Sequence, residues 1–344
     1  KIAAANLYRI SISGDFVGYG PARAAHGYSR VDSYDLSPWQ GKEVLITVEV
    51  HSANVNSYYL IDERPFFAAE ILGGEALFAT AKDFSAFHLT SRVQKVRKFS
   101  FQRTFTEIYR LDRDPVLFYQ GKTLPYPVAE TEDVEINKLL PRYVKYPKYD
   151  RKEMLLLEEG SVTVDPNGAP YRDRVYSAID PVSRKGFYPF EIEDDAADEV
   201  NKFRYRAFDS AVGGKMAADT YRFYDLSRTI TGFFTLHLKA LEDLTAYIIF
   251  EEVEIKEEDH RRVDPFRGTC SNIVKYELKA GEYHLLNFEA NSAKFACLAV
   301  MGGSAEICDF AMLTYENPDA ADFSYDYGDE ELNLIVDAAV NTFA

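Results

Sequence analysis

Apolar and polar residues alternate along many short segments of this chain, and this pattern constrains its fold more than any other feature. Residues 7–12 alternate in this way, and so do residues 43–50, where Val44, Val48 and Val50 share one face. A period of two places successive side chains on opposite faces of a β-strand, so both segments are predicted to be strands. The strongest further strand candidates are 98–111, 229–240, 244–255, 272–290, 294–303 and 305–316.

Glycine and proline residues separate these segments at short intervals. Many short strands with such turns are typical of sandwiches and jelly rolls. The predicted fold class is therefore mainly β, with tandem β-sandwich domains of the jelly-roll, galactose-binding-like kind and a C-terminal amphipathic helix. The predicted units are a first sandwich (1–111), an irregular connector with a hairpin (112–200), a second sandwich (201–318), and a linker with a helix (319–344).

Three local features carry more specific expectations. Asp165–Gly168 has the composition of a β-turn and is predicted to close a hairpin in the connector. Lys279–Gly281 is predicted to be the turn of a second hairpin. The acidic run 191–200 is predicted to be a solvated helix or loop rather than a cation site.

The C-terminal segment has the pattern of a single amphipathic helix. Acidic residues at 329–331 stand where a helix N-terminus favours negative charge. One apolar stripe then follows at helical spacing, made of Leu332, Ile335, Val336, Ala339, Val340 and Phe343. Such a stripe requires a covering surface, which is either a face of the second sandwich or a further helical domain.

Composition excludes several functions. The formal net charge of −16 over 344 residues argues against a partner with a phosphate backbone and against anionic membrane surfaces. It suits a neutral ligand such as a sugar, and the 14% aromatic content supplies rings that either fill β-sandwich cores or stack on sugars. The sequence contains no run of about 20 apolar residues and no recognisable signal peptide.

Sequence motifs for catalysis and metal binding are also missing. The sequence has no glycine-rich phosphate loop, no HExxH and no GxSxG. The six histidines do not lie two or four residues apart, and the three cysteines form no CxxC, so neither a metal site nor a cofactor is predicted. The glutamates of 251–258 include carboxylates that could form a glycosidase pair, but an exposed strand end explains them better.

The loop 20–42 is the most unusual surface segment. Arginine, aspartate and aromatic side chains provide the donors, the acceptor and the stacking face that grip a sugar. The candidate carbohydrate-binding residues are Arg23, Tyr28, Arg30, Asp32 and Trp39. The alternative is a structural loop that orders the entry to a strand.

Several segments resemble, in the same order, the N-terminal β-sandwich region of bacterial α-L-rhamnosidases of glycoside hydrolase family 78. They begin with "GDFVGYGPARAAHGYSRVDSYDL" and "GKEVLITVEV", and "NSYYLIDERPFFAAEI" continues the pattern. "YDLSRTITGFFTLHLKALEDLTAYIIFEEV" and "YELKAGEYHLLNFEANSAKFACLAV" resemble the next sandwich, and "FSYDYGDEELNLIVDAAVNTF" resembles the entry to the helical barrel. This sequence departs from the family's pattern at the first turn, where residues 14–18 replace the usual Asn-Gly turn.

The resemblance implies that the catalytic residues belong to another part of the same polypeptide. The C-terminal helix would be the first of an (α/α)6 barrel of the same polypeptide, and the catalytic carboxylates would follow it. No residue of this chain is therefore predicted to be catalytic. The full-length protein is expected to hydrolyse terminal α-L-rhamnosides with inversion, so that a rhamnose-containing glycan and the barrel are the expected partners, with no nucleic acid and no membrane. A bacterial enzyme that degrades glycans would be periplasmic or extracellular.

Two alternatives to this non-catalytic portion of a glycoside hydrolase remain at this point. In the first, the chain is a stand-alone carbohydrate-binding sandwich that binds a sugar through the loop 20–42. In the second, it is a scaffold protein whose last helix packs on its own second sandwich.

Overall fold

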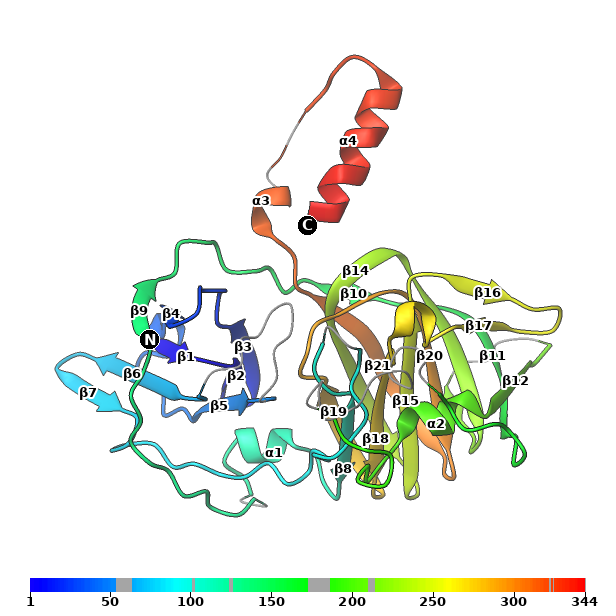
Figure 1. Ribbon diagram of the computed structural model, residues 1–344, viewed down its shortest axis with the longest axis horizontal. Coiled ribbons are helices and arrows are strands. Elements are labelled where there is room, and N and C mark those ends of the chain that lie inside the picture. Colours follow the sequence, from blue (N-terminus) through cyan, green and yellow to red (C-terminus); the bar gives the residue numbers. More distant parts are fainter. Residues whose placement is uncertain are drawn as a thin grey trace.

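The computed structural model covers the whole chain (Figure 1). The structure describes residues 1–53, 64–100, 103–123, 126–172, 186–209, 214–321, 323 and 325–343. Two sequence predictions fall partly outside these ranges: the second strand of the hairpin after Asp165–Gly168, and the segment 56–71 that resembles the rhamnosidases.

The N-terminal part of the molecule is built from short strands. Its elements are β1 (Ile2–Ala4), β2 (Leu7–Ile12), β3 (Asp15–Gly20), β4 (Tyr28–Val31), the 3-10 helix η1 (Ser37–Trp39), β5 (Ile46–His51), β6 (Phe67–Gly73), β7 (Ala76–Ala79), α1 (Val116–Tyr119) and β9 (Lys138–Pro141). They form the sheets β3-β2-β5, β1-β6-β7 and β4-β9.

The remaining elements form a larger β-rich part and a C-terminal extension. The strands of the larger part are β8 (Glu107–Leu111), β10 (Arg151–Glu153), β11 (Leu155–Val164), β12 (Phe203–Ala207), β13 (Lys215–Met216), β14 (Thr220–Ala240), β15 (Leu244–Glu251), β16 (Glu254–Lys256), β17 (Arg261–Val263), β18 (Ile273–Leu278), β19 (Gly281–Leu286), β20 (Asn291–Met301) and β21 (Ala305–Thr314). The helices are α2 (Ala196–Asn201), η4 (Arg267–Thr269), α3 (Pro318–Ala321) and α4 (Glu330–Phe343).

In the N-terminal part, the sheet β3-β2-β5 packs against β1 and β6. The alternation of β2 directs Tyr8 and Ile10 into this core, where they meet Ile2 and Ala4 of β1. Burying such side chains contributes about 1.5–3 kcal/mol for each large apolar group. This arrangement confirms the strands predicted from the alternation of 7–12 and 43–50.

The turn between β2 and β3 differs from the sequence interpretation. Ile12 pairs with Asp15, so the connection has only two central residues, Ser13 and Gly14. Both have positive φ values, 50° and 94°, as a type I′ hairpin turn requires. Residues 15–20 form a strand, so the interpretation of 14–18 as a replacement for the usual two-residue turn was wrong.

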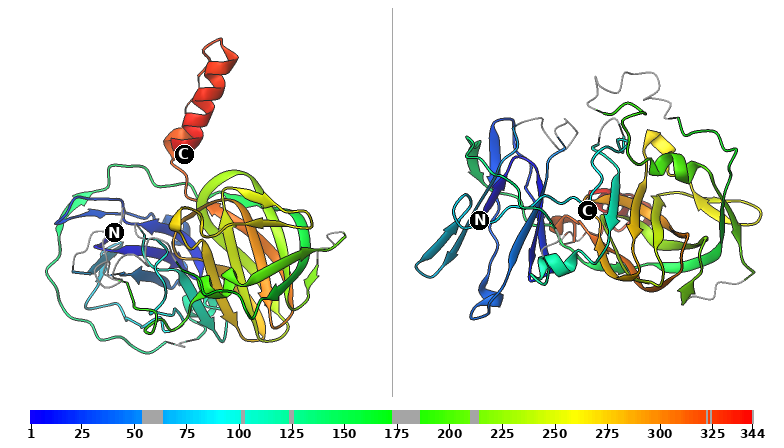
Figure 2. Two further views of the ribbon diagram at one scale, coloured as in Figure 1. Left: turned by 45° about the vertical axis from the view of Figure 1, so that its right-hand side comes forward. Right: turned by 90° about the horizontal axis from the view of Figure 1, so that it is seen from below.

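Eleven strands of the larger part form one hydrogen-bonded sheet that folds over itself, as the two views in Figure 2 show, and β16 and β17 form a separate two-stranded sheet. The sheet folds over because β14, a strand of 21 residues, changes its pairing partners along its length. Residues 220–225 and 230–232 pair with β20, and residues 232–240 pair with β21. Ser227, with a φ of 64°, lies between the two halves, where the strand bends.

The two layers enclose the main core. Phe234, Leu236 and Leu238 point inwards from β14, and Ile248 and Phe250 from β15 meet them. The structure thus confirms the mainly β class and the C-terminal helix, and its two-layer arrangement fits the predicted sandwich.

Strand connections in this part differ from two expectations. β18 and β19 are consecutive, but β18 pairs with β15 and β8, whereas β19 pairs with β14. Lys279–Gly281 therefore carries the chain from one layer to the other, and the predicted hairpin was wrong, because both edges of β18 are already occupied. Among the described residues of 98–111, β8 is the one strand, and it joins the larger sheet instead of closing the first unit. The domain boundaries as such remain a prediction.

The acidic run is less solvated than its composition indicated. It forms α2, whose N-cap Asp195 accepts a hydrogen bond from the Asp198 amide, 3.2 Å away. Asp194 is buried, and Lys275 donates to both of its oxygens at 2.9 and 3.0 Å. A buried carboxylate needs such a partner, so this acidic residue anchors α2 to β18.

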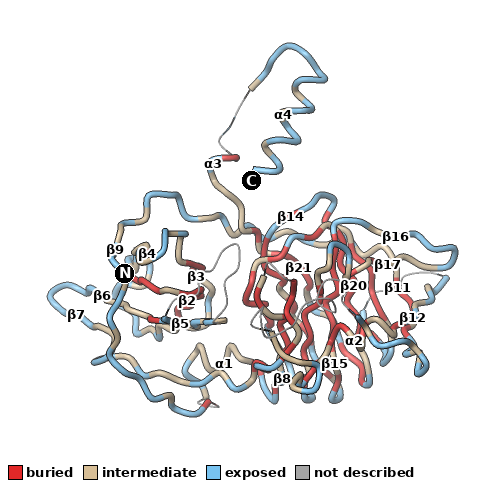
Figure 3. The backbone as a smooth tube through the Cα atoms, in the orientation of Figure 1, coloured by how far each residue is buried: buried red, intermediate tan, exposed pale blue. Residues whose placement is uncertain are grey.

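Helix α4 projects away from both β-rich parts (Figures 1 and 3). None of its described residues is buried, and Leu332, Ile335 and Phe343 of the predicted stripe are 49%, 58% and 64% exposed. The packing of this helix on the second sandwich, which the scaffold alternative requires, is absent from the described residues. Within the described chain, no helix has the length and apolar character needed to span a membrane.

Candidate functional site

The N-terminal part meets the larger sheet along β2, whose second face is also buried. Leu7 packs with Phe233 and Phe288 of the larger part. Arg9, on the same face, donates to the backbone carbonyls of Leu286 and Asn287 at 2.9 and 3.3 Å. Arg9 is also ion-paired with Glu49 of β5, so its buried charge is neutralised. This junction brings together polar residues from distant parts of the sequence.

A cavity of about 1440 Å³ opens beside this junction. Strand β5 forms one wall, and the segments 83–94, 118–121 and 131–136 form the others. Aromatic side chains, including Phe118 and Tyr119, and polar ones, including Glu49, line it. Pockets for small molecules usually measure about 300–1,000 Å³, so this cavity has room for a ligand of more than one sugar ring.

Two buried groups on the cavity wall, Arg92 and His51, lack hydrogen-bond partners. Arg92 is 8% exposed, and neither of its terminal nitrogens makes a hydrogen bond. Its Nη2 lies 3.8 Å from Glu289 Oε1, and its guanidinium stacks on Phe288. The Nε2 of His51 likewise has no hydrogen-bond partner. Leaving buried donors unpaired costs roughly 1–3 kcal/mol each. None of these nitrogens is accessible to water, so an oxygen atom of a ligand would reach them only after the side chains that cover them move.

The electrostatics of this wall favour a neutral His51. Burial and the neighbouring charge of Arg92 lower the pKa of His51 well below its usual value. A neutral imidazole both donates and accepts a hydrogen bond, so it is suited to a hydroxyl group.

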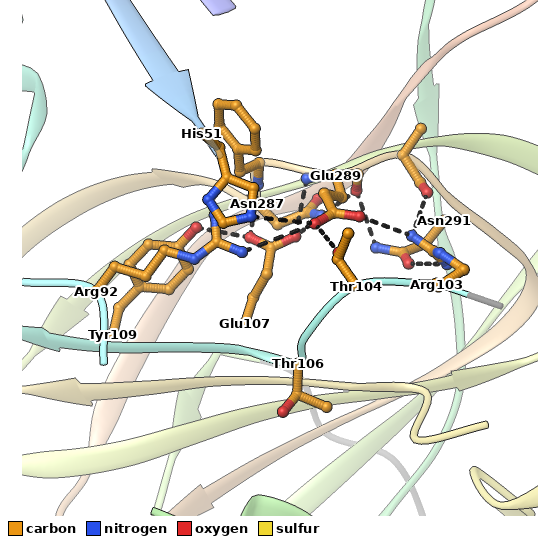
Figure 4. Close-up of polar contacts among 12 residues, drawn as sticks. His51, Arg92, Arg103, Thr104, Thr106, Glu107, Tyr109, Asn287, Glu289 and Asn291 are labelled. Atoms are coloured by element: carbon orange, nitrogen blue, oxygen red, sulfur yellow. Dashed lines mark hydrogen bonds and ion pairs between the residues drawn. The ribbon is translucent and has the colours of Figure 1, made fainter. Parts of the chain in front are cut away.

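Behind this wall lies a network of buried polar residues, shown in Figure 4, which centres on Glu107 and Glu289. Glu289 accepts a hydrogen bond of 2.5 Å from Thr104 and is ion-paired with Arg103 at 3.5 Å. Arg103 also donates to Asn291 at 3.0 Å. These contacts connect the segment after β19 to the segment that leads into β8.

Glu107 has no oxygen available for a substrate. Its Oε2 accepts hydrogen bonds from the Phe288 amide at 2.7 Å and from the Tyr109 hydroxyl at 2.6 Å. Its Oε1 accepts from the Glu289 amide at 2.8 Å and from Asn287 Nδ2 at 3.1 Å. Burial and the charge of Glu107 raise the pKa of Tyr109, which therefore remains a donor. The geometry is that of a structural anchor, not of a general acid or base.

The predicted sugar-binding residues lie elsewhere, on and around β4. Asp32 is fully buried, accepts a hydrogen bond from Tyr8, and is ion-paired with Arg142 at 2.9 Å. Arg30 donates to the Pro141 carbonyl at 3.0 Å and stacks on Tyr143. Asp32 thus holds the loop in place, as the structural interpretation of this segment expected.

The other three predicted residues are more accessible. Tyr28 is 38% exposed, with Lys138 over its ring. Arg23 is exposed in the loop before β4, and Trp39 is partly buried in η1. Tyr28 and Arg30 lie on β4 and Asp32 directly follows it, but each of the three contacts a different part of 138–143. A sugar-binding role for the five residues remains a prediction.

Sequence reasoning missed His51, Arg92, Glu107 and Glu289. These residues lie far apart in the sequence, and no motif links them. The one local signal was the presence of charged residues within apolar strand-like segments, such as Glu107 in "TFTEIYRL".

Comparison with known proteins identifies similar folds among solved structures but no similar sequence among protein families or curated proteins. No protein-family model matches the sequence, and no curated protein matches it. The crystal structure of a GH78 family rhamnosidase of Bacillus sp. GL1 is similar, with a TM-score of 0.71 and 11% sequence identity. The similarity covers 92% of this chain and 52% of that chain. This chain folds like about half of a GH78 rhamnosidase.

A second rhamnosidase is more weakly similar. The structure of the α-L-rhamnosidase from Dictyoglumus thermophilum matches 92% of this chain and 30% of that chain, with a TM-score of 0.44 and 15% identity. That score is too low to support an argument. The resemblance to α-L-rhamnosidases that the sequence indicated is confirmed at the level of the fold.

Proposed function

We propose that this chain is a non-catalytic portion of an α-L-rhamnosidase-like glycoside hydrolase, which in full hydrolyses terminal α-L-rhamnosides with inversion. The observation that carries the proposal is the fold similarity over 92% of this chain to about half of a GH78 rhamnosidase. Fold alone does not give function, so two features of the chain's own residues support it further.

The first supporting feature is the exposed face of α4. Its apolar side chains Leu332, Ile335 and Phe343 are about half exposed or more. Since about half of each side chain is already covered, full burial would contribute roughly 1–2 kcal/mol for each, so an uncovered stripe is unfavourable in water. We propose that helices of a catalytic barrel cover this face.

The second supporting feature is the state of the buried carboxylates. An inverting glycosidase needs one protonated carboxyl group and one carboxylate that activates a water between them. Glu107 is saturated by four donors, and Glu289 is held by Thr104 and Arg103. Both therefore stabilise the fold instead of serving as acid and base.

The test is an assay of the 344-residue chain with an aryl α-L-rhamnoside, beside a complete α-L-rhamnosidase as positive control. We expect release of the aryl group by the control only. Hydrolysis by the chain that disappears in Glu289→Gln would assign catalysis to this segment and overturn the proposal.

A second candidate function is carbohydrate binding by the cavity beside β5. The unpaired nitrogens of Arg92 and His51 favour it, because a sugar hydroxyl that displaces the side chains covering them would satisfy them. The aromatic lining supplies apolar surface for the sugar ring.

Calorimetric titration with L-rhamnose and rhamnose-containing oligosaccharides tests this function. Gln94→Ala, on the exposed rim of the cavity, and Arg92→Met are expected to weaken binding at least tenfold, whereas Tyr28→Ala in the loop 20–42 leaves it unchanged. Weaker binding only in Tyr28→Ala would place the sugar at the loop instead. Absence of binding to every sugar would refute both sites.

A further inference from the structure

The outer face of the layer that contains β14 and β19 carries a histidine pair. His237 of β14 and His284 of β19 are direct cross-strand partners. Their rings stack with centroids 4.1 Å apart. Both side chains are accessible, because the alternation that sends Leu236 and Leu238 into the core sends His237 outwards.

Glu282 lies beside this pair on the same face. It is two residues before His284 on β19, and its Oε1 lies 2.8 Å from His237 Nε2. One ligand atom from each of the three residues lies within 4.8 Å of the others.

A fourth residue orients His284. Asp114 Oδ2 lies 2.7 Å from His284 Nδ1 and accepts a hydrogen bond of 3.1 Å from the His284 amide. Asp114 is itself held by the Val116 amide at 3.0 Å. When Nδ1 donates to a carboxylate, Nε2 is the nitrogen that carries a lone pair, and metal-binding histidines commonly have this arrangement.

We propose that His237, Glu282 and His284 bind a divalent transition-metal ion, with Zn²⁺ the best match. Two imidazole nitrogens and one carboxylate oxygen suit Zn²⁺, Co²⁺ or Ni²⁺, whereas Mg²⁺ and Ca²⁺ prefer oxygen ligands alone. A water molecule would complete the tetrahedron.

The three ligand atoms lie close enough to converge on one ion once the stacked histidine rings turn out of their nearly parallel planes. With metal–ligand distances of about 2.0–2.2 Å, two ligand atoms of a tetrahedral ion lie roughly 3.3–3.5 Å apart. His237 Nε2 and Glu282 Oε1, at 2.8 Å, need to separate only slightly. The remaining ligand atoms need to approach by about 1 Å or more, which small rotations of exposed side chains allow.

The neighbouring charges are mixed. Lys239 lies opposite Glu282 in the strand register and competes with a cation for that carboxylate. Asp309 of β21 lies opposite His237 and is ion-paired with Arg151. Removing the charge of Lys239 is therefore expected to tighten metal binding.

Bound metal would link β19 to β14 across the strand pair. This role is independent of the proposed glycosidase function, because it depends only on the outer face of one sheet layer. An ion that binds the folded chain alone also raises the stability of that chain.

The experiment is a titration of the untagged chain with Zn²⁺ by calorimetry and with Co²⁺ by visible absorption. We expect one ion per chain and Co²⁺ bands typical of tetrahedral coordination. His237→Ala and His284→Ala should each weaken binding at least tenfold, Asp114→Asn by about 10–100-fold, and Lys239→Ala should strengthen it. His26→Ala, which removes an exposed histidine of the loop 20–42, is the matched control and should bind normally.

Circular dichroism of each variant establishes that a loss of binding does not reflect unfolding. Binding that is equal in His237→Ala and in the unsubstituted chain would refute the site. So would the absence of binding at about 1 mM Zn²⁺, a concentration that corresponds to only about 4 kcal/mol of binding energy.

Discussion

Glu107→Gln is expected to be among the most destabilising substitutions of similar size in this chain. Glu107 is 4% exposed and accepts four hydrogen bonds through its two oxygens. Glutamine keeps the shape but replaces one acceptor oxygen with an amide group that donates. Whichever oxygen is replaced, one backbone amide, that of Phe288 or of Glu289, then faces another donor.

The magnitude follows from these contacts. A buried donor left unpaired costs roughly 1–3 kcal/mol. The hydrogen bonds that survive lose their charged acceptor, which costs about another 1 kcal/mol each, because bonds to charged groups contribute about 1.5–3 kcal/mol and neutral ones about 0.5–1.5 kcal/mol. The sum is about 3–5 kcal/mol.

Hydrogen exchange of the Phe288 and Glu289 amides measures this loss of stability at the two backbone groups that donate to Glu107. A loss of about 3 kcal/mol lowers their protection roughly a hundredfold. Glu75→Gln, in the exposed turn between β6 and β7, is the matched control and should leave protection unchanged. Protection of the two amides within threefold of the unsubstituted chain would show that Glu107 does not anchor this segment.

Two further predictions concern stability. The folded-state pKa of His51 is depressed, so below about pH 6.5 the unfolded chain binds a proton that the folded chain excludes, and stability falls as the pH falls. Urea unfolding at several values between pH 7 and pH 5 should show that the free energy of unfolding falls less steeply with falling pH in His51→Gln than in the unsubstituted chain, by up to about 1.4 kcal/mol per pH unit. The same pH dependence in both proteins would contradict this account. Gly232→Ala should cost about 1–3 kcal/mol, since its Cβ would lie 2.1 Å from the Leu313 carbonyl oxygen, whereas Gly73→Ala meets no atom within 4 Å and should melt like the unsubstituted chain.

The site shows where local sequence reasoning ends. The residue types of the loop 20–42 predict a sugar-binding surface, yet Asp32 is fully buried against Tyr8 and Arg142. A buried ion pair with a residue 110 positions away leaves no local trace. The spacing rule for histidines likewise does not detect the pair His237 and His284, because these residues meet only through the pairing of β14 with β19.

By itself, the sequence determined the strands, the mainly β class and the amphipathic helix at the C-terminus. These follow from period-two and helical periodicities, which act over a few residues. The tertiary structure alone decided how the strands connect. Whether β18 and β19 form a hairpin or enter different layers depends on which strand edges β15, β8 and β14 occupy. The polar network around Glu107 likewise exists only because packing desolvates residues that are distant in the sequence, and a buried charge must then find its partners in space.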